Sequence, residues 1–193
     1  MDWRVRLRED LSRIHQLATA HPDPRPPALS ALELMTIVLE DRRFFNHAGV
    51  DLRSVARELV KAATGRKHGG ASTIDMQFVR TATGYRKNSM GRKVYEALLA
   101  VIIQSRYRKR QILRSYIDGA YFGSGLIGAS MAAQKVFGKQ PGELDLEEAA
   151  LIAAMLACPR PLNGSAAWRG KAERRAAYAL QVYATHRRRL ANH

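Results

Sequence analysis

The chain is short of cysteine, of acidic residues and of long hydrophobic runs, and each shortage excludes a class of structure. Cys158 is the only cysteine among 193 residues, so no intramolecular disulfide can form, although this leaves the redox compartment open. Residues 1–24 are charged throughout and contain no apolar stretch near the roughly 20 residues that a membrane span needs. We therefore expect neither a signal sequence nor a transmembrane segment in this chain.

Acidic residues are outnumbered, because 32 lysines and arginines stand against 17 aspartates and glutamates. The formal net charge of +15 indicates a polyanionic partner, which can be a nucleic acid, an anionic lipid surface or a substrate that carries a diphosphate. Charge alone does not choose among them. The most basic segments are RYRKR at 106–110 and the three arginines at 187–189.

Length and proline content predict one folded domain after a short lead. A chain of 193 residues with 46% hydrophobic content can bury a core and leaves no room for a second catalytic domain. The prolines at 22–27 are incompatible with a helix interior. We expect a basic, proline-rich lead over 1–27 and the domain over 28–193.

The apolar spacing predicts a predominantly α-helical fold. Ser30 and Glu33 form a capping-box pattern before a helix that ends at Glu40, and Asp51 is suited to cap the next helix. Further helices are predicted after Ser72 or Thr73, from Ser89 onward, and across 112–117, 131–137, 145–156 and 171–190.

Two of these helices carry predicted buried stripes. Leu98, Val101 and Ile102 are expected to face the core, which would leave Arg92, Lys93 and Glu96 together on a face that lines a cleft. In the last helix the predicted stripe consists of Ala176, Leu180, Tyr183 and Ala184.

Four blocks of sequence carry the chemistry. They are EDRRFFNHAGVD at 40–51, GGASTIDMQFVR at 69–80, RKVYEALLA at 92–100 and ILRSYIDGAYFGSGLIGASMAAQKVFGK at 112–139. In this order and spacing they resemble glycosyltransferase family 51, the peptidoglycan glycosyltransferases. The resemblance runs from about residue 31 to residue 163.

The resemblance implies a single lysozyme-like helical domain with a smaller membrane-facing lobe. It implies polymerisation of lipid II into β-1,4 glycan strands, with inversion and release of undecaprenyl diphosphate, at the outer face of the bacterial cytoplasmic membrane. The expected partners are lipid II, the nascent glycan strand and an anionic membrane surface, with no nucleic acid. No organic cofactor is expected.

The resemblance also gives roles to residues. Glu40 matches the general base, and Phe44 and Phe45 beside it are expected to desolvate it. Glu96 matches the second essential acid. The groups expected to bind the leaving diphosphate are Arg80, Arg92 and Lys93, and those expected to contact other parts of the substrate are Phe44, His47, Ser72, Thr73, Gln77 and Tyr116.

A divalent cation, Mg²⁺ or Mn²⁺, is a further expectation from the resemblance. Glu96 is the candidate ligand that would bridge the cation to the diphosphate. The sequence shows no dedicated cluster of metal ligands, so no metal site is assigned from the residues themselves.

The sequence departs from the family pattern at several positions. Asp75 and Met76 stand where threonine and glutamine are usual, Arg80 replaces a common lysine, Arg114 replaces an acid and Asp118 replaces an asparagine. These departures keep open a catalytically degenerate module that binds lipid II or glycan without polymerising it.

Two other functions remain as alternatives. A lysozyme-like hydrolase would use Glu40 as a general acid on preformed glycan. A nucleic-acid binder would explain the positive charge but not the two acidic motifs. The plainest interpretation of Glu40 and Asp41 is a surface ion pair with Arg42 or Arg43, and that of Glu96 is an ion-paired helix surface.

Overall fold

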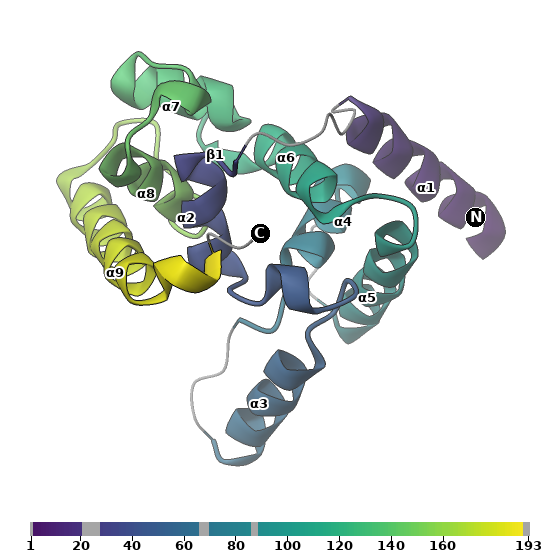
Figure 1. Cartoon of the computed structure of the whole chain (residues 1–193). Helices are drawn as coiled ribbons and strands as arrows, with labels where there is room; N and C mark the ends of the chain where they lie inside the picture. The colour runs from purple at the N-terminus through teal and green to yellow at the C-terminus, as the bar shows by residue number, and fades with distance from the viewer. Residues whose placement is uncertain (1, 21–27, 66–69, 86–88, 191–193) are drawn as a thin grey trace. The chain divides into compact units, whose positions relative to one another are not determined.

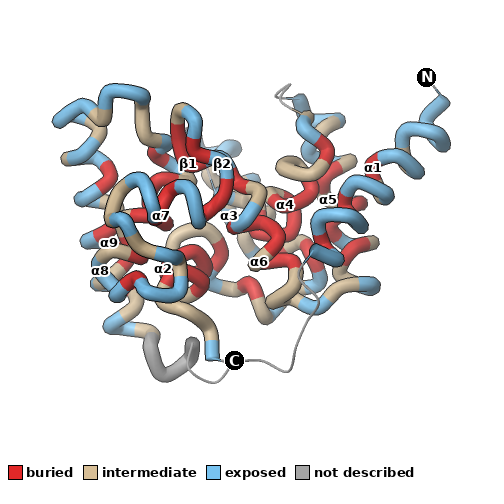
Figure 2. Tube along the Cα trace, turned by 90° about the horizontal axis from the view of Figure 1, so that it is seen from above, coloured by how far each residue is buried: buried red, intermediate tan, exposed pale blue. Residues whose placement is uncertain are grey.

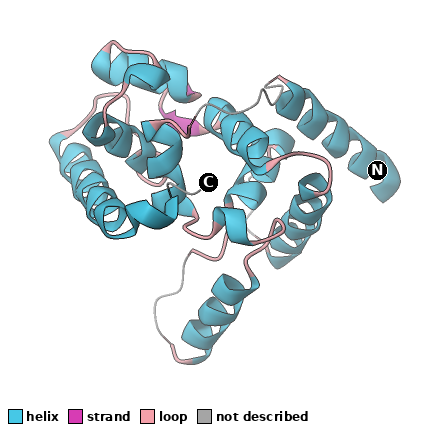
Figure 3. Ribbon diagram, viewed as in Figure 1, coloured by secondary structure: helices cyan, strands magenta, loops and turns pink. Residues whose placement is uncertain are grey.

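The computed structural model describes residues 2–20, 28–65, 70–85 and 89–190. Over these residues the chain forms nine α-helices, two short 3-10 helices and one two-stranded hairpin (Figure 3). The predominantly helical prediction is confirmed. The chain divides into two compact units, one made of Met1–Asp23 and Arg43–Tyr116, the other of Pro24–Arg42 and Ile117–His193.

The first unit is built around α4. Its elements are α1 (Trp3–Thr19), η1 (Phe44–Asn46), α3 (Leu52–Ala63), α4 (Ile74–Thr83), α5 (Met90–Gln104) and most of α6 (Lys109–Gly119). Helix α4 packs against α5 on one side and α1 on another (Figure 1). The core side chains of this unit include Ile14, Phe44, Ile74, Phe78, Val79, Leu99, Ile103, Ile112 and Leu113.

Helix α1 occupies most of the segment for which only a basic lead was predicted. Asp2 caps it by accepting a hydrogen bond from the Arg4 backbone N–H. Only Asp10, Ile14 and Ala18 are buried on this helix, and the rest of its tube is largely exposed (Figure 2). The prolines at 22–27, on which the predicted boundary rests, lie outside the described residues.

The second unit is built around α8. Its elements are α2 (Ala31–Glu40), β1 (Tyr121–Gly123), β2 (Leu126–Ile127), α7 (Ala129–Phe137), η2 (Pro141–Glu143), α8 (Leu146–Ala154) and α9 (Ala166–Leu190). Helix α8 packs against both α2 and α9, which also contact each other. Four of its buried residues are alanines, whose small side chains let neighbouring helices approach closely. The predicted role of the 146–163 apolar run as core is confirmed for α8.

The N-terminal ends of the helices are the features of the fold that the local sequence predicts most accurately. The Ser30 and Glu33 capping box is present, and Asp51, Thr73 and Ser89 cap α3, α4 and α5. Each cap depends on contacts within three residues, so the sequence alone specifies it. The β1–β2 hairpin was missed because strands of three and two residues are too short to show alternation.

The predicted buried stripe of α5 is wrong. Leu98 is 59% exposed and Val101 is 49% exposed, whereas Glu96, Leu99, Ala100 and Ile103 are buried. The helix is apolar on two faces, and packing against α4 selects the face that also carries Glu96. Helix α3 has no buried residue, and its Leu52 and Leu59 are exposed.

The predicted stripe of α9 is correct in only one position. Ala176 is buried, but Leu180 and Tyr183 are half-buried and Ala184 is exposed. The buried positions are Ala172, Ala176, Ala179 and Val182, which follow the same helical period with a shifted phase. The side chains of the 187–189 arginines lie outside the described residues.

No helix among residues 2–20, 28–65, 70–85 and 89–190 combines the length and apolar character required to cross a lipid bilayer.

Candidate functional site

The residues singled out from the sequence fall in both units. Glu40 is the last residue of α2 in the second unit, as predicted for a helix end. His47, the second and third blocks, and Tyr116 belong to the first unit.

Glu40 is bound by an arginine from the far end of the sequence. Arg175 of α9 donates a hydrogen bond from Nη2 to Oε1 of Glu40 at 2.9 Å. The side chain of Glu40 is 12% exposed, so a cation within the same unit stabilises a largely buried carboxylate. Arg43, in the first unit, contacts Asp51 at 3.2 Å.

Glu96 is the centre of a buried charge cluster in the first unit. Its side chain is fully buried and receives hydrogen bonds from Arg80 Nε at 3.0 Å and Arg80 Nη2 at 2.8 Å. Arg92 Nε lies 3.2 Å from Oε1 of the same carboxylate. The hydrogen bonds to Glu96 raise the pKa of the Arg80 guanidinium, although burial opposes the charge.

The charges of this cluster do not cancel. Two guanidinium groups and one carboxylate carry one net positive charge, and the side chain of Arg80 is 35% exposed. Glu96 therefore fixes two arginines while leaving the cluster attractive to an anion. The paired arginines can bind phosphate oxygens through several N–H groups at once.

The predicted charged trio on one open face of α5 is only partly correct. Arg92 and Glu96 are in contact, but Glu96 is buried and Lys93 is exposed. The surroundings of Glu96 do not fit a divalent cation, because both carboxylate oxygens already accept hydrogen bonds from Arg80 and a second guanidinium lies beside them.

Thr73 links the first block to the second. It is almost fully buried, accepts a hydrogen bond from the Met76 backbone N–H at 3.2 Å and donates one to the Gly49 carbonyl at 2.6 Å. The hydroxyl of Thr73 is thus hydrogen-bonded to the protein backbone on both sides, so Thr73 has a structural role. Ser72 beside it is half-buried.

Gly49 supports this link through its backbone geometry. Its φ of +88° is unfavourable for residues with a side chain, and an added Cβ would lie 2.5 Å from the Ala100 carbonyl oxygen on α5. We expect Gly49→Ala to lower the free energy of unfolding by at least about 2 kcal/mol. Urea unfolding of this variant beside Gly65→Ala is the measurement, since Gly65 also has positive φ but no atom within 4 Å of an added Cβ. Equal losses in the two variants would contradict the close contact with α5.

Gln77 connects the second block to the fourth. Tyr116 donates a hydrogen bond from its hydroxyl to Gln77 Oε1 at 2.6 Å. Tyr116 is buried and Gln77 is half-buried, so the tyrosine orients the amide of Gln77 from the core side.

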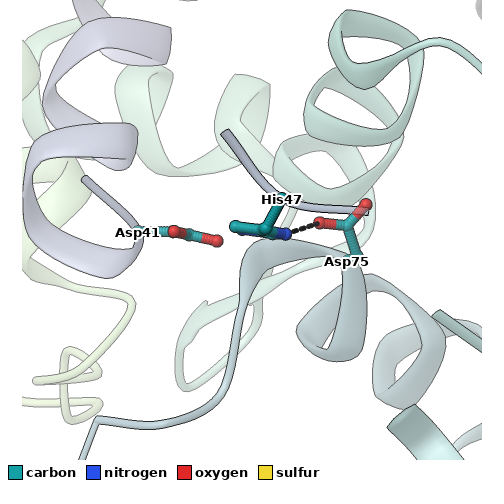
Figure 4. A group of neighbouring side chains, drawn as sticks. All are labelled: Asp41, His47 and Asp75. Carbon is teal, nitrogen blue, oxygen red and sulfur yellow. Dashed lines mark ion pairs between the residues drawn. The ribbon is translucent and has the colours of Figure 1, made fainter. Parts of the chain in front are cut away.

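His47 and Asp75 point toward one another in the first unit (Figure 4), with Nδ1 of the histidine 4.0 Å from Oδ2 of the aspartate. Lys109 of α6 donates to the same Oδ2 at 2.8 Å, and its Nζ is 4.5 Å from the centre of the Phe44 ring. Phe44 is fully buried, which makes it a core residue in this structure. Asp41, also drawn in Figure 4, belongs to the second unit.

The ion pair with Lys109 accounts for a departure from the family pattern. Asp75 is fully buried, and a buried carboxylate needs a compensating charge. We expect Lys109→Ala to lower the free energy of unfolding by about 3 kcal/mol. Lys61→Ala, which removes a half-exposed pair with Glu58, is the matched control and is expected to cost less than about 1 kcal/mol in the same denaturation experiment. Similar small losses in both variants would contradict a buried, compensated Asp75.

Comparison with protein families decides the assignment. A family model described as transglycosylase matches residues 22–183, a range that contains all four blocks. The chain belongs to the transglycosylase family. This membership supports a glycosyltransferase that acts in peptidoglycan and cell-wall biosynthesis.

Several relatives of this transglycosylase domain are penicillin-binding proteins. Penicillin-binding protein 1A of Aquifex aeolicus is 39% identical over 128 residues, which cover 66% of this chain and 18% of the relative. Penicillin-binding protein 1A of Rickettsia felis is 38% identical over 131 residues, with 66% and 17% covered. Penicillin-binding protein 2a of Streptococcus pneumoniae is 36% identical over 135 residues, with 68% and 18% covered. The chain spans less than a fifth of the length of these relatives.

Sequence reasoning missed Arg175 and Lys109 as partners of motif residues. Arg175 follows Glu40 by 135 positions and Lys109 follows Asp75 by 34 positions, so no local spacing connects them. The only available signal was chemical, because a carboxylate expected to be buried requires a cation from somewhere in the chain.

Proposed function

We propose that this transglycosylase domain polymerises lipid II into β-1,4 glycan strands with inversion and release of undecaprenyl diphosphate. The observation that carries the proposal is the cluster of Arg80, Glu96 and Arg92, in which a buried acid holds two guanidinium groups and leaves a net positive charge. A cluster of this kind suits a leaving group with two phosphates.

In the proposed reaction Glu40 acts as the general base. It takes the proton from the 4-hydroxyl of the GlcNAc residue of the acceptor lipid II. The hydrogen bond that Arg175 donates to Oε1 of Glu40 holds this carboxylate in a fixed orientation for the transfer. The predicted desolvation of Glu40 by Phe44 and Phe45 stays a prediction, since those residues belong to the other unit.

The acceptor oxygen then attacks the anomeric carbon of the donor's MurNAc residue. The new C–O bond forms on the face opposite the departing oxygen, so the α-linked donor gives a β-1,4 bond. The bond to undecaprenyl diphosphate breaks with its electron pair, and Arg80 and Arg92 stabilise the charge that develops on the diphosphate. Lys93, exposed on the same helix, is proposed to assist them. His47, Ser72, Gln77 and Tyr116 are proposed to hold or support the sugar portions.

The proposed site of action is the outer face of the cytoplasmic membrane. Exposed apolar side chains of the first unit and the charge of the whole chain support contact with an anionic lipid surface. Helix α3 exposes Leu52, which is 75% exposed, as well as Leu59 and Val60, and α5 exposes Val94 and Leu98. The net charge of +15 adds electrostatic attraction to such a surface.

A catalytically degenerate binding module is the second candidate, and the departures from the family pattern motivate it. Among them, Asp75 is compensated by Lys109 and Met76 is buried in the core. Tyr116, between Arg114 and Asp118 in sequence, still contacts Gln77. Asp75 and Met76 are thus compatible with an intact local architecture, and the polymerisation assay decides between the two candidates.

The test is incubation of the intact chain with fluorescent lipid II in detergent, with and without Mg²⁺. The proposal predicts glycan polymer and released undecaprenyl diphosphate. Binding of lipid II without polymer would instead support the degenerate module. Release of reducing ends from preformed peptidoglycan would support the hydrolase.

A further inference from the structure

Helix α1 lies outside the 22–183 range that matches the transglycosylase family, yet it is joined to the first unit by a buried polar cluster. Asp10 is only 1% exposed in the middle of this helix. Its Oδ2 accepts hydrogen bonds from the hydroxyls of Tyr85 at 2.7 Å and Tyr95 at 2.9 Å. We call Asp10, Tyr85 and Tyr95, together with Arg6, the α1 clasp.

Arg6 completes the α1 clasp from the exposed side. Its Nε donates to the Tyr85 hydroxyl at 2.6 Å, and its guanidinium carbon lies 4.3 Å from the centre of the Tyr85 ring and 5.6 Å from that of Tyr95. Burial and the hydrogen bond to Asp10 raise the pKa of both tyrosines, so both hydroxyls stay protonated donors near neutral pH.

The two tyrosines lie on either side of the connection between α4 and α5 in the sequence. Tyr85 directly follows Gly84, the C-cap of α4, and Tyr95 lies in the second turn of α5 next to Glu96. Asp10 therefore binds the residue that follows the C-cap of α4 and a residue in the second turn of α5 through one carboxylate oxygen. Gln111 Nε2 also donates to the Ala18 carbonyl at 2.9 Å, and His15 lies 2.8 Å from the Tyr107 hydroxyl, which anchors the C-terminal half of α1.

The α1 clasp is connected to the proposed diphosphate site by a hydrogen bond between Arg92 and Tyr85. Arg92 Nη1 donates to the Tyr85 carbonyl at 3.4 Å, while its Nε contacts Glu96 at 3.2 Å. Tyr85, which is bound to Asp10, therefore holds Nη1 of Arg92. Glu96, which follows Tyr95 in the sequence, contacts Nε. An arginine constrained in this way loses less side-chain entropy when it binds a phosphate.

We infer that Asp10 is a positioning residue for Arg92, and that α1 is a functional part of the donor site. This inference rests on the proposed role of Arg92 in binding the diphosphate. It assigns a task to a helix outside the family match, and it explains why a mostly polar helix carries a buried carboxylate.

The first experiment measures order directly and needs no activity. Hydrogen–deuterium exchange is compared in the intact chain, Asp10→Ala, Asp10→Asn and the exposed neighbour control Glu9→Ala. Asp10→Ala should speed exchange in peptides covering 89–97 and leave α8 unchanged, while Asp10→Asn should restore much of the protection because an amide oxygen still accepts hydrogen bonds. Unchanged exchange at 89–97 in Asp10→Ala would overturn the inference, whether or not the chain polymerises lipid II.

The second experiment asks whether Asp10 acts through Arg92. Asp10→Ala is expected to lower kcat/KM for lipid II polymerisation by about 10- to 100-fold, but by less than about twofold when Arg92 is already lysine. Tyr95→Phe, which removes one hydrogen bond without opening a cavity, should show the same dependence on Arg92 if Asp10→Ala folds poorly. Fully additive losses would overturn the inference. Absence of polymer with the intact chain would refute the proposed function, and the exchange experiment would still decide whether Asp10 orders this segment.

Discussion

Glu40→Gln is expected to lower kcat for lipid II polymerisation by at least about 100-fold, because an amide cannot take the proton from the acceptor hydroxyl. Glutamine retains the shape of the side chain and can still accept the hydrogen bond that Arg175 donates at 2.9 Å. The variant should therefore fold normally. Initial rates with labelled lipid II, together with the thermal unfolding midpoint, measure both expectations.

Glu173→Gln is the matched control for this variant, because Glu173 is an exposed acid on α9 two residues before Arg175. Its polymerisation rate should stay within about twofold of the unmodified chain, since an exposed residue away from special contacts has little effect. A Glu40→Gln variant that keeps more than a tenth of the original kcat would exclude Glu40 as the general base.

Arg80→Ala is expected to have the largest combined effect on stability and activity. It removes both hydrogen bonds that Glu96 receives from Arg80 and leaves a fully buried carboxylate with Arg92 alone from the cluster. We expect a loss of about 3 kcal/mol in the free energy of unfolding and loss of detectable polymerisation. Urea unfolding and the lipid II assay measure the two consequences.

Arg80→Lys separates the charge of this residue from its geometry. Lysine keeps the positive charge, but an ammonium group cannot bind both oxygens of Glu96 as the guanidinium does through Nε and Nη2. We expect it to recover a large part of the stability and to polymerise within about tenfold of the unmodified chain. If Arg80→Ala polymerises as well as Arg80→Lys, the cation at position 80 does not stabilise the leaving diphosphate.

Local sequence predicted the helix caps and the position of Glu40 because those features depend on neighbours a few residues away. Ser30 with Glu33 and Asp51 before α3 are examples, and all of these contacts form as predicted. The burial of α5 was not predictable in the same way. Its Leu98 stripe and its Leu99 stripe are both apolar, and the choice between them depends on packing against α4.

In the candidate site, too, residues within the sequence motifs were predictable, whereas partners distant in the sequence were not. The sequence indicated Glu40, Arg80, Arg92 and Glu96 through their resemblance to the family motifs. It could not indicate Arg175, because that contact joins residues 135 positions apart. Asp10 was missed for another reason. A helix with one buried acid and two buried small or apolar residues shows little hydrophobic pattern, so the sequence predicts only a charged lead there.

The most direct test of the account is polymerisation of labelled lipid II by the intact chain beside Glu40→Gln and Glu96→Gln, with lipid II binding measured in parallel. We expect polymer from the intact chain and a rate at least about 100-fold lower from either variant. If the intact chain binds lipid II but none of the three proteins makes polymer, the domain is a binding module and its assignment as a glycosyltransferase is contradicted.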